Sequence, residues 1–308
     1  MIYVLWHKVP DTDAITSAIV YAHYLNQTWY KAIPLALGEA NKETLFVLEQ
    51  AWVTVPDINP ELVEGSTIAL VDHNESAQSI SNIKNYTIHS VIDHHKIGDL
   101  ETWYPLILRF EPVASTNTVL YKMYKESHIT LDKSIATLML GGILSDTLHF
   151  RSPTTTEFEK SIVPELAHIA EIDDITSFAM SMFAAKSDLG DISAYTLIKH
   201  IDAKDFTFAG RKALIACIET TNPDYCLSRK TEILDTIRTI KSEEWYDFIL
   251  FCVIDILHEK NTTLVASDAE AKIIKDVFGA DTVDGQADLW DRISRKKTIV
   301  PVLEEKLI

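Results

Sequence analysis

Short apolar runs interleaved with helical segments dominate the first half of the chain. Uninterrupted apolar runs of this length are typical of strands buried on both faces, and parallel strands need long, usually helical connections between them. The sequence therefore predicts an α/β fold whose N-terminal part is a mostly parallel sheet flanked by helices. The expected strands are Ile2–Trp6, Lys31–Leu37, Ser66–Val71 and Thr87–Ile92. The expected helices are Ala14–Leu25, Lys42–Trp52, Ser115–Glu126, Asp132–Leu144 and Thr155–Ile172.

The pattern changes at the polar, glycine-containing stretch Lys186–Ser193, which we interpret as a hinge. Beyond it, Phe206–Glu219 and Asp247–Leu257 resemble longer strands of a mixed sheet, interleaved with helices. We therefore expect an N-terminal domain over residues 1–187, a linker over 188–193 and a smaller C-terminal α/β domain over 194–308. An active site is expected in the cleft between the two domains.

Charge and composition exclude several classes of partner. The 308 residues carry a formal net charge of −17, whereas a nucleic-acid-binding face or an anionic membrane surface requires basic residues. We expect neither as a partner, although a small anionic substrate is compatible with locally gathered basic residues. No run approaches the roughly 20 apolar residues of a membrane span. Three cysteines without metal-type spacing, Cys217, Cys226 and Cys252, predict reduced thiols in a cytoplasmic protein.

Four apolar runs of the first half end in acidic residues or histidines. Because the carboxyl ends of parallel strands lie along one edge of a sheet, we expect these polar side chains to converge there. A lone histidine or aspartate after a strand is usually a surface or capping residue, but four such groups together favour a binding site. The groups are His7 with Asp11 and Asp13, Asp72 with His73, Asp93 with His94 and His95, and Asp146 with His149.

Clustered carboxylates repel one another, and divalent cations remove that conflict. Oxygen and imidazole ligands without thiolates suit Mn²⁺, Co²⁺, Fe²⁺, Zn²⁺ or Mg²⁺. The candidates outnumber the ligands of one tetrahedral site, whereas two ions about 3.5–4 Å apart with a shared carboxylate would use them all. We interpret His73, His89 and His149 as neighbours of this site.

Six ordered blocks extend the pattern over nearly the whole chain and resemble the DHH phosphoesterase superfamily. More narrowly, they resemble the manganese-dependent family II inorganic pyrophosphatases. The Asp93-His94-His95 block marks the superfamily, and the Ser294-Arg295-Lys296-Lys297 block favours the pyrophosphatase branch. The blocks are His7–Ala22, Leu70–Ser79, Val91–Thr102, Glu111–Lys122, Gly141–Thr156 and Ser294–Glu305.

The resemblance implies roles for individual residues. One metal would be bound by His7, Asp11 and Asp72, and the other by Asp13, Asp72, His94 and Asp146, with Asp72 as the bridge. Asp93 and His95 would be the catalytic pair, Asp93 orienting and His95 touching substrate. Lys204, Arg295 and Lys296 would bind the phosphates from the C-terminal domain.

The resemblance also implies two Mn²⁺ per chain, with Co²⁺ as a possible substitute and Mg²⁺ arriving with the substrate. Pyrophosphate would be hydrolysed to two phosphates by a hydroxide shared between the metals, in a homodimer formed through the N-terminal domain. Val9, Ala114, Ile293 and Thr298 depart from the family pattern, but none of them replaces a metal ligand.

Two other functions remain open from the sequence. An exopolyphosphatase or phosphodiesterase of the same superfamily would keep the metals and act on a longer or nucleotide substrate. The chain has no glycine-rich block of the kind found in the nucleotide-cleaving branch, which disfavours that reading. A non-catalytic regulator that binds a phosphate ligand is the third possibility, and the complete set of ligands speaks against it.

Overall fold

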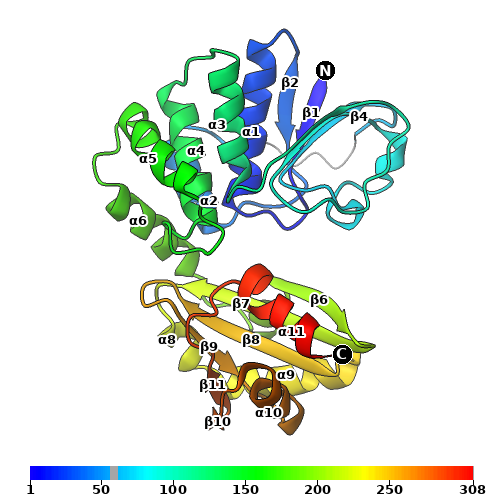
Figure 1. The fold of residues 1–308 in the computed structure, drawn as a ribbon, viewed down its shortest axis with the longest axis vertical. Coiled ribbons are helices and arrows are strands. Elements are labelled where there is room, and N and C mark those ends of the chain that lie inside the picture. The colour runs from blue at the N-terminus through cyan, green and yellow to red at the C-terminus, as the bar shows by residue number, and fades with distance from the viewer. Residues whose placement is uncertain (56–61, 308) are drawn as a thin grey trace. The chain divides into compact units, whose positions relative to one another are not determined.

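The computed structural model describes residues 1–55 and 62–307 and divides the chain into two compact units. Unit 1 covers Met1–Lys186 and unit 2 covers Ser187–Ile308 (Figure 1). Each unit contains one sheet and its own helices. Within the described residues, no helix combines the length and the apolar character needed to cross a membrane.

The sheet of unit 1 has five strands in the order β2-β1-β3-β4-β5, and all neighbouring pairs are parallel. The predicted parallel sheet is therefore confirmed, with its four expected strands. The fifth, β5, was not predicted, because its short run is interrupted by Arg109 and half exposed at the sheet edge. The strands are β1 (Ile2–Leu5), β2 (Ala32–Leu35), β3 (Thr67–Val71), β4 (Thr87–Asp93) and β5 (Ile107–Phe110).

Capping side chains set the starts of the helices in unit 1. Asp11, Asn41, Ser115 and Asp132 each accept a backbone N–H of the first turn of their helix, as polar N-cap residues do. Thr156 forms a full capping box with Glu159. The five expected helices are confirmed, and α6 is added. Their bounds are α1 (Thr12–Gln27), α2 (Lys42–Gln50), α3 (Thr116–Glu126), α4 (Lys133–Asp146), α5 (Glu157–Ala170) and α6 (Ile175–Ser187).

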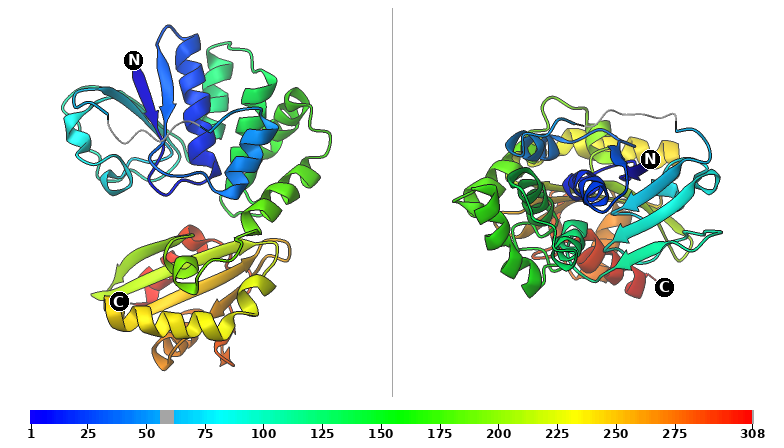
Figure 2. Two further views of the ribbon diagram at one scale, coloured as in Figure 1. Left: turned by 180° about the vertical axis from the view of Figure 1, so that it is seen from behind. Right: turned by 90° about the horizontal axis from the view of Figure 1, so that it is seen from above.

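The two faces of this sheet are covered differently. The helices group on one side, where α1 packs on β1 and β3 and α3 packs on β4 (Figure 2). On the other side, Leu5 and Leu70 pack in one apolar cluster with Ile80 and Ile83, which come from the segment between β3 and β4. That segment contains two short 3₁₀ turns, Ser76–Gln78 and Ile83–Asn85. Among the described residues, helices therefore cover one face, and irregular chain with apolar side chains packs on the other.

Gly142 allows α4 to approach α1 and α3 closely. A β-carbon at this position would lie 2.3 Å from Asn117 Nδ2 and 2.8 Å from both Asp13 Oδ1 and Thr16 Oγ1. These distances are far below a van der Waals contact, so only glycine fits between the present neighbours. Asp146 is the last residue of the same helix. The lack of a side chain at Gly142 therefore allows Asp146 to lie close to Asp13.

Unit 2 contains the predicted mixed sheet, in the order β10-β11-β9-β8-β7-β6. The pair β7–β8 is parallel and the remaining pairs are antiparallel. Its strands are β6 (Ala203–Phe208), β7 (Arg211–Thr220), β8 (Phe248–Asp255), β9 (Lys260–Leu264), β10 (Thr282–Val283) and β11 (Gln286–Asp288). Its helices are α7 (Ala194–Lys199), α8 (Asp224–Leu227), α9 (Lys230–Glu244), α10 (Asp268–Ile273) and α11 (Val300–Lys306), with π-helical turns at Ile274–Phe278 and Arg295–Ile299.

One expectation for unit 2 was wrong. The run Phe206–Glu219 is not a single strand, because β6 and β7 form an antiparallel hairpin within it. The two connecting residues, Ala209 and Gly210, both have positive φ angles, 48° and 81°. A two-residue turn with this backbone matches the twist of the paired strands, and Gly210 was its signal in the sequence.

Candidate metal centre

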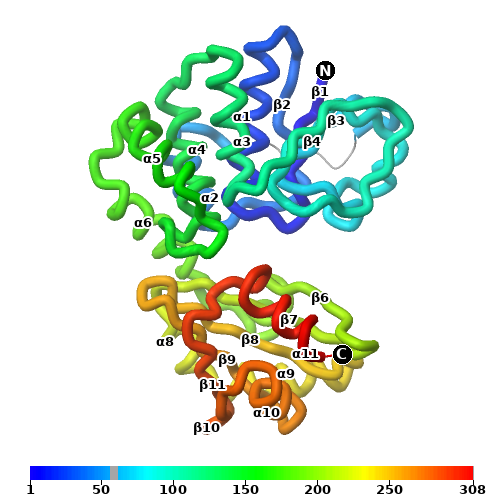
Figure 3. Tube along the Cα trace, in the orientation of Figure 1, coloured from blue at the N-terminus to red at the C-terminus, as the bar shows by residue number. Residues whose placement is uncertain are grey.

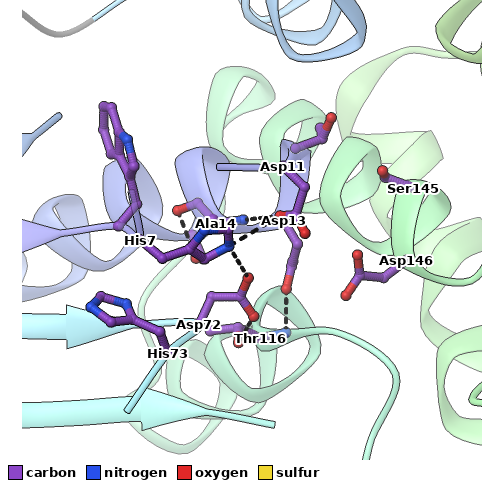
Figure 4. Close-up of polar contacts among 12 residues, drawn as sticks. His7, Asp11, Asp13, Ala14, Asp72, His73, Thr116, Ser145 and Asp146 are labelled. Atoms are coloured by element: carbon purple, nitrogen blue, oxygen red, sulfur yellow. Dashed lines mark hydrogen bonds and ion pairs between the residues drawn. The ribbon is translucent and has the colours of Figure 1, made fainter. Parts of the chain in front are cut away.

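The proposed metal ligands come from four segments of unit 1. His7 follows β1, and Asp11 and Asp13 lie at the start of α1. Asp72 follows β3, and His94 follows β4. These positions match the expected edge of the sheet, where the carboxyl ends of β1, β3 and β4 lie together (Figure 4).

Asp146 reaches the site from a helix and not from the end of a sheet strand. The apolar run Gly141–Leu144 lies in the expected helix, which the structure confirms as α4, and Asp146 is the last residue of that helix. The position is nevertheless close to the other ligands, because Asp146 Oδ2 lies 3.4 Å from His94 Nε2.

The Asp72 carboxylate is buried at the centre of the group. Its Oδ2 lies 3.5 Å from His7 Nε2, its Oδ1 lies 3.3 Å from His94 Nε2, and Thr116 Oγ1 donates a 2.9 Å hydrogen bond to Oδ1. Although burial disfavours the charge, the imidazoles of His7 and His94 hold the pKa of Asp72 well below its ordinary value. The backbone has a φ of 59°, an uncommon conformation for a residue with a side chain. It is held by the Asp72 N–H, which donates to the Ile92 carbonyl at 3.0 Å.

His94 is oriented as metal-binding histidines usually are. Its Nδ1–H donates to the Val113 carbonyl at 3.0 Å, which fixes the ring and directs Nε2 toward Asp72 and Asp146. His73 supports the neighbouring imidazole instead. Its Nδ1–H donates to the Val71 carbonyl at 2.8 Å, and its ring stands edge-on to His7 with centroids 6.1 Å apart. Burial lowers the pKa of His73 to about 4, so this ring is neutral.

Asp13 is buried against the N-terminus of α3. It accepts hydrogen bonds from Ser115 Oγ (2.5 Å), the Thr116 N–H (2.7 Å), the Asn117 N–H (3.2 Å) and Asn117 Nδ2 (2.7 Å). Burial raises the pKa of Asp13 to about 7, and repulsion by Asp72 adds to the effect. Asp13 and Asp72 are thus two neighbouring carboxyl groups with opposite pKa shifts. Ser115, Thr116 and Asn117 were missed as supporting residues, although Ser115 is a typical N-cap residue and signals a helix start.

Asp93 fixes the position of His95. Its Oδ1 accepts the backbone N–H groups of His94 (2.7 Å) and His95 (3.0 Å) and the Nδ1–H of the His95 ring (2.8 Å). Asn74 Nδ2 donates to its Oδ2 at 2.6 Å. Burial favours the neutral acid, but the hydrogen bond and the charge of His95 outweigh it and lower the pKa of Asp93. The Asp93 carboxylate therefore orients the His95 ring through this hydrogen bond.

The donor atoms fit a divalent metal of the manganese type. Within the described residues, three sets of potential ligands have their donor atoms within 4.8 Å of one another. Two sets share Asp72, two share His94, and the donors are carboxylate oxygens and imidazole nitrogens without thiolates. The sets are His7 with Asp11 and Asp72, Asp72 with His94 and His95, and Asp13 with His94 and Asp146. All six residues predicted as ligands are thus brought together, and His95 joins them.

The three basic residues predicted to bind phosphate in unit 2 differ in how exposed their side chains are. Lys204 in β6 and Lys296 have exposed side chains. Arg295 is largely buried: Nη2 lies 2.6 Å from Asp202 Oδ1, and Nη1 donates to the Asp202 carbonyl at 2.9 Å. Its side chain is 10% exposed, so the guanidinium is engaged within unit 2 in this structure.

Comparisons with known proteins agree with this fold. A model of the DHH family N-terminal domain matches residues 1–143, and a model of the DHHA2 domain matches residues 180–306. A protein of Deinococcus radiodurans named as a probable manganese-dependent inorganic pyrophosphatase is 46% identical over 99% of this chain and 98% of its own length. A Bacillus licheniformis protein with the same name is 40% identical over 99% and 98%.

Solved structures give the same picture. A Methanococcus jannaschii structure assigned to the family II inorganic pyrophosphatases is 36% identical, with a TM-score of 0.83 over 100% of this chain and 99% of that chain. An exopolyphosphatase-related protein from Bacteroides fragilis, 14% identical with a TM-score of 0.50 over 99% and 91%, shares the fold alone. A DHH domain followed by a DHHA2 domain defines the class of this protein. Within that class, the chain belongs to the manganese-dependent inorganic pyrophosphatase family, also called family II.

The raised pKa of Asp13 predicts that binding of Mn²⁺ releases a proton. In the metal-free protein the carboxyl keeps its proton up to about pH 7, above its ordinary value of 3.8. Its contribution to stability is therefore full below about pH 4 and is lost as the pH rises through about 7. Bound Mn²⁺ needs the ionised form, so affinity should fall up to about tenfold for each pH unit below 7.

Titration calorimetry of Mn²⁺ binding in buffers of different ionisation enthalpy, at about pH 6.5 and about pH 8.5, measures this release. Asp13→Asn is the comparison, because it isolates the proton that belongs to this carboxyl group. This variant should release fewer protons than the original chain at about pH 6.5 and an equal number at about pH 8.5. Equal release by both proteins at the lower pH would contradict the assignment.

Proposed function

We propose that this chain hydrolyses pyrophosphate to two phosphates in a reaction that depends on Mn²⁺. The observation that carries the proposal is the convergence of five carboxylate and imidazole side chains with the buried Asp72. Membership of the manganese-dependent inorganic pyrophosphatase family supports the substrate and the metal.

The ligands divide into two sets with one shared member. We assign His7, Asp11 and Asp72 to one ion and Asp13, Asp72, His94 and Asp146 to the other. When bound, the ions supply positive charge that screens the phosphates and lowers the pKa of a water molecule for attack on phosphorus. Co²⁺ is the expected substitute because it accepts the same oxygen and nitrogen ligands, and Mg²⁺ is expected to enter with the substrate.

Unit 1 also supplies the proposed catalytic pair. Asp93 accepts the Nδ1–H of His95 at 2.8 Å, which fixes the orientation of the ring. The His95 side chain is 27% exposed, whereas the Asp93 side chain is fully buried. We therefore assign His95 to contact with a phosphate oxygen and Asp93 to the orientation and charge of that ring.

The first prediction of this proposal concerns metal and substrate together. Chelation should abolish phosphate release from pyrophosphate, and Mn²⁺ or Co²⁺ should restore it better than Mg²⁺ alone. Release of phosphate from pyrophosphate and tripolyphosphate is then compared with release of mononucleotide from a dinucleotide, and pyrophosphate should give the highest kcat/KM. Preference for tripolyphosphate or the dinucleotide would favour an exopolyphosphatase or a phosphodiesterase. Absence of turnover on all three, with Mn²⁺ bound, would favour a regulatory binding protein.

We further propose that Lys204, Arg295 and Lys296 bind the phosphates of the substrate. Two lysines offer point charges and an arginine offers a planar fork that suits a phosphate group. Because the Arg295 guanidinium is paired with Asp202, substrate binding by this residue requires it to exchange the carboxylate for a phosphate. Arg295 would then have two partners, one in the free and one in the bound state.

Arg295→Ala should therefore lower kcat/KM by about 30- to 1000-fold, the effect of losing one charge-assisted contact to the transition state. Its Mn²⁺ content should not change, and Arg295→Lys should restore only part of the rate because a point charge does not replace the fork. The Tm of each variant measures how much stability is lost with the Arg295–Asp202 ion pair. Arg211→Ala, at an exposed arginine of β7, is the matched control. Unchanged kcat/KM in Arg295→Ala would restrict this residue to a structural role.

We propose a homodimer formed through the edge of the sheet in unit 1. Strand β5 is an edge strand, and Ile107 and Leu108 on it are 51% and 56% exposed. An exposed apolar edge strand is a template for pairing with a second copy. Sedimentation velocity should show a dimer for the original chain and a monomer for Leu108→Lys. Leu45→Lys, at an exposed leucine of α2, should remain dimeric; a dimeric Leu108→Lys would contradict this interface.

Chemistry elsewhere in the chain favours a reducing compartment. Cys217, Cys226 and Cys252 are buried free thiols, as is usual for cytoplasmic proteins. The acidic surface disfavours nucleic acids and anionic membranes as partners. We therefore propose a cytoplasmic enzyme whose partner is a small phosphate anion.

A further inference from the structure

Glu43 is a further buried carboxylate beside the proposed metal ligands, and it has no role in the reaction described above. It is in the first turn of α2 and is fully buried. Its Oε2 accepts hydrogen bonds from Thr12 Oγ1 at 2.8 Å and from Ser145 Oγ at 2.9 Å. A buried carboxylate is costly unless donors surround it, so its position is defined by these contacts.

The two hydroxyl groups belong to residues that adjoin proposed ligands. Thr12 stands between Asp11 and Asp13 at the start of α1, and Ser145 directly precedes Asp146 at the end of α4. Figure 4 shows Ser145 and Asp146 on the same end of that helix. Figure 3 shows α2 running beside α4, in agreement with their packing. One carboxylate oxygen thus joins the segments that carry three of the six ligands.

A cation completes the arrangement. Lys186 Nζ lies 3.8 Å from Glu43 Oε2, and its side chain is 27% exposed. Lys186 is in the last turn of α6 and is the last residue of unit 1. The charge of Glu43 is therefore stabilised by the N-terminus of its own helix and by Lys186.

We propose that Glu43 is a positioning residue for the metal centre, an inference that rests on the metal site proposed above. By accepting from Thr12 and Ser145 through one oxygen, it keeps Asp11 and Asp13 of α1 at a fixed distance from Asp146 of α4. Hydrogen-bonded groups behind metal ligands set ligand geometry, and their loss usually weakens metal binding by about 10- to 100-fold. Glu43 itself does not touch substrate or metal.

Equilibrium dialysis with Mn²⁺ tests this role on the complete chain without reliance on turnover. Glu43→Gln keeps the shape of the side chain and removes its charge, and it should weaken Mn²⁺ binding by about 10- to 100-fold. Ser145→Ala removes one hydrogen bond and should weaken binding by about fivefold. Glu49→Gln is the matched control, since Glu49 is an exposed glutamate of the same helix, and its binding should equal that of the original chain.

Thermal unfolding of the metal-free variants separates positioning from stability. If Glu43 only stabilises the fold, Glu43→Gln will lower the Tm of the metal-free protein and leave the Mn²⁺ dissociation constant unchanged, which would overturn the inference. If Glu43→Gln does not fold, Ser145→Ala decides, and unchanged Mn²⁺ binding in that variant would overturn it too. Failure of the original chain to bind Mn²⁺ would instead refute the proposed function, so the two failures are distinguishable.

Discussion

The metal centre depends on one physical conflict, the burial of two carboxyl groups side by side. Asp13 and Asp72 are both almost inaccessible to solvent, and each raises the cost of ionising the other. The fold resolves the conflict by giving them different surroundings. Two imidazoles and a hydroxyl surround Asp72 and keep it ionised. Burial raises the pKa of Asp13 to about 7, although its carboxyl group accepts four hydrogen bonds. A divalent cation bound between these carboxyl groups would stabilise the ionised form of both.

The surrounding residues hold the ligands on rigid elements. The carboxyl ends of β1, β3 and β4 provide His7, Asp72 and His94, and α1 and α4 provide the carboxylates opposite them. The N-terminus of α3 adds two backbone N–H groups directed at Asp13. Side chains supported in this way need little reorganisation to bind an ion.

Sequence reasoning reached the elements and residues that have local signals. The parallel sheet, the capped helices and the gathering of the acidic and histidine side chains could be predicted because strand periodicity, capping residues and the Asp-His-His block are visible within a few residues. Strand β5 and the hairpin at Ala209–Gly210 were missed because their apolar patterns are short or continuous. The pairing of Arg295 with Asp202 joins residues 93 positions apart, and that of Glu43 with Ser145 joins residues 102 apart. Contacts of this kind follow from tertiary packing and leave no pattern in the sequence.

The absence of a side chain at Gly142 in α4 leaves room for the side chain of Asn117 in α3. Asn117 fills the space that a methyl group at 142 would need, and it donates to Asp13 from that space. Because Asp13 and Thr16 also lie 2.8 Å from the position of the added carbon, a smaller residue at 117 would not suffice, and α4 would have to move away from α1. Asp146 ends α4 and Asp13 lies in the first turn of α1, so this movement would increase the distance between two proposed metal ligands. One methyl group would thus change the geometry of the proposed centre without any change to a ligand.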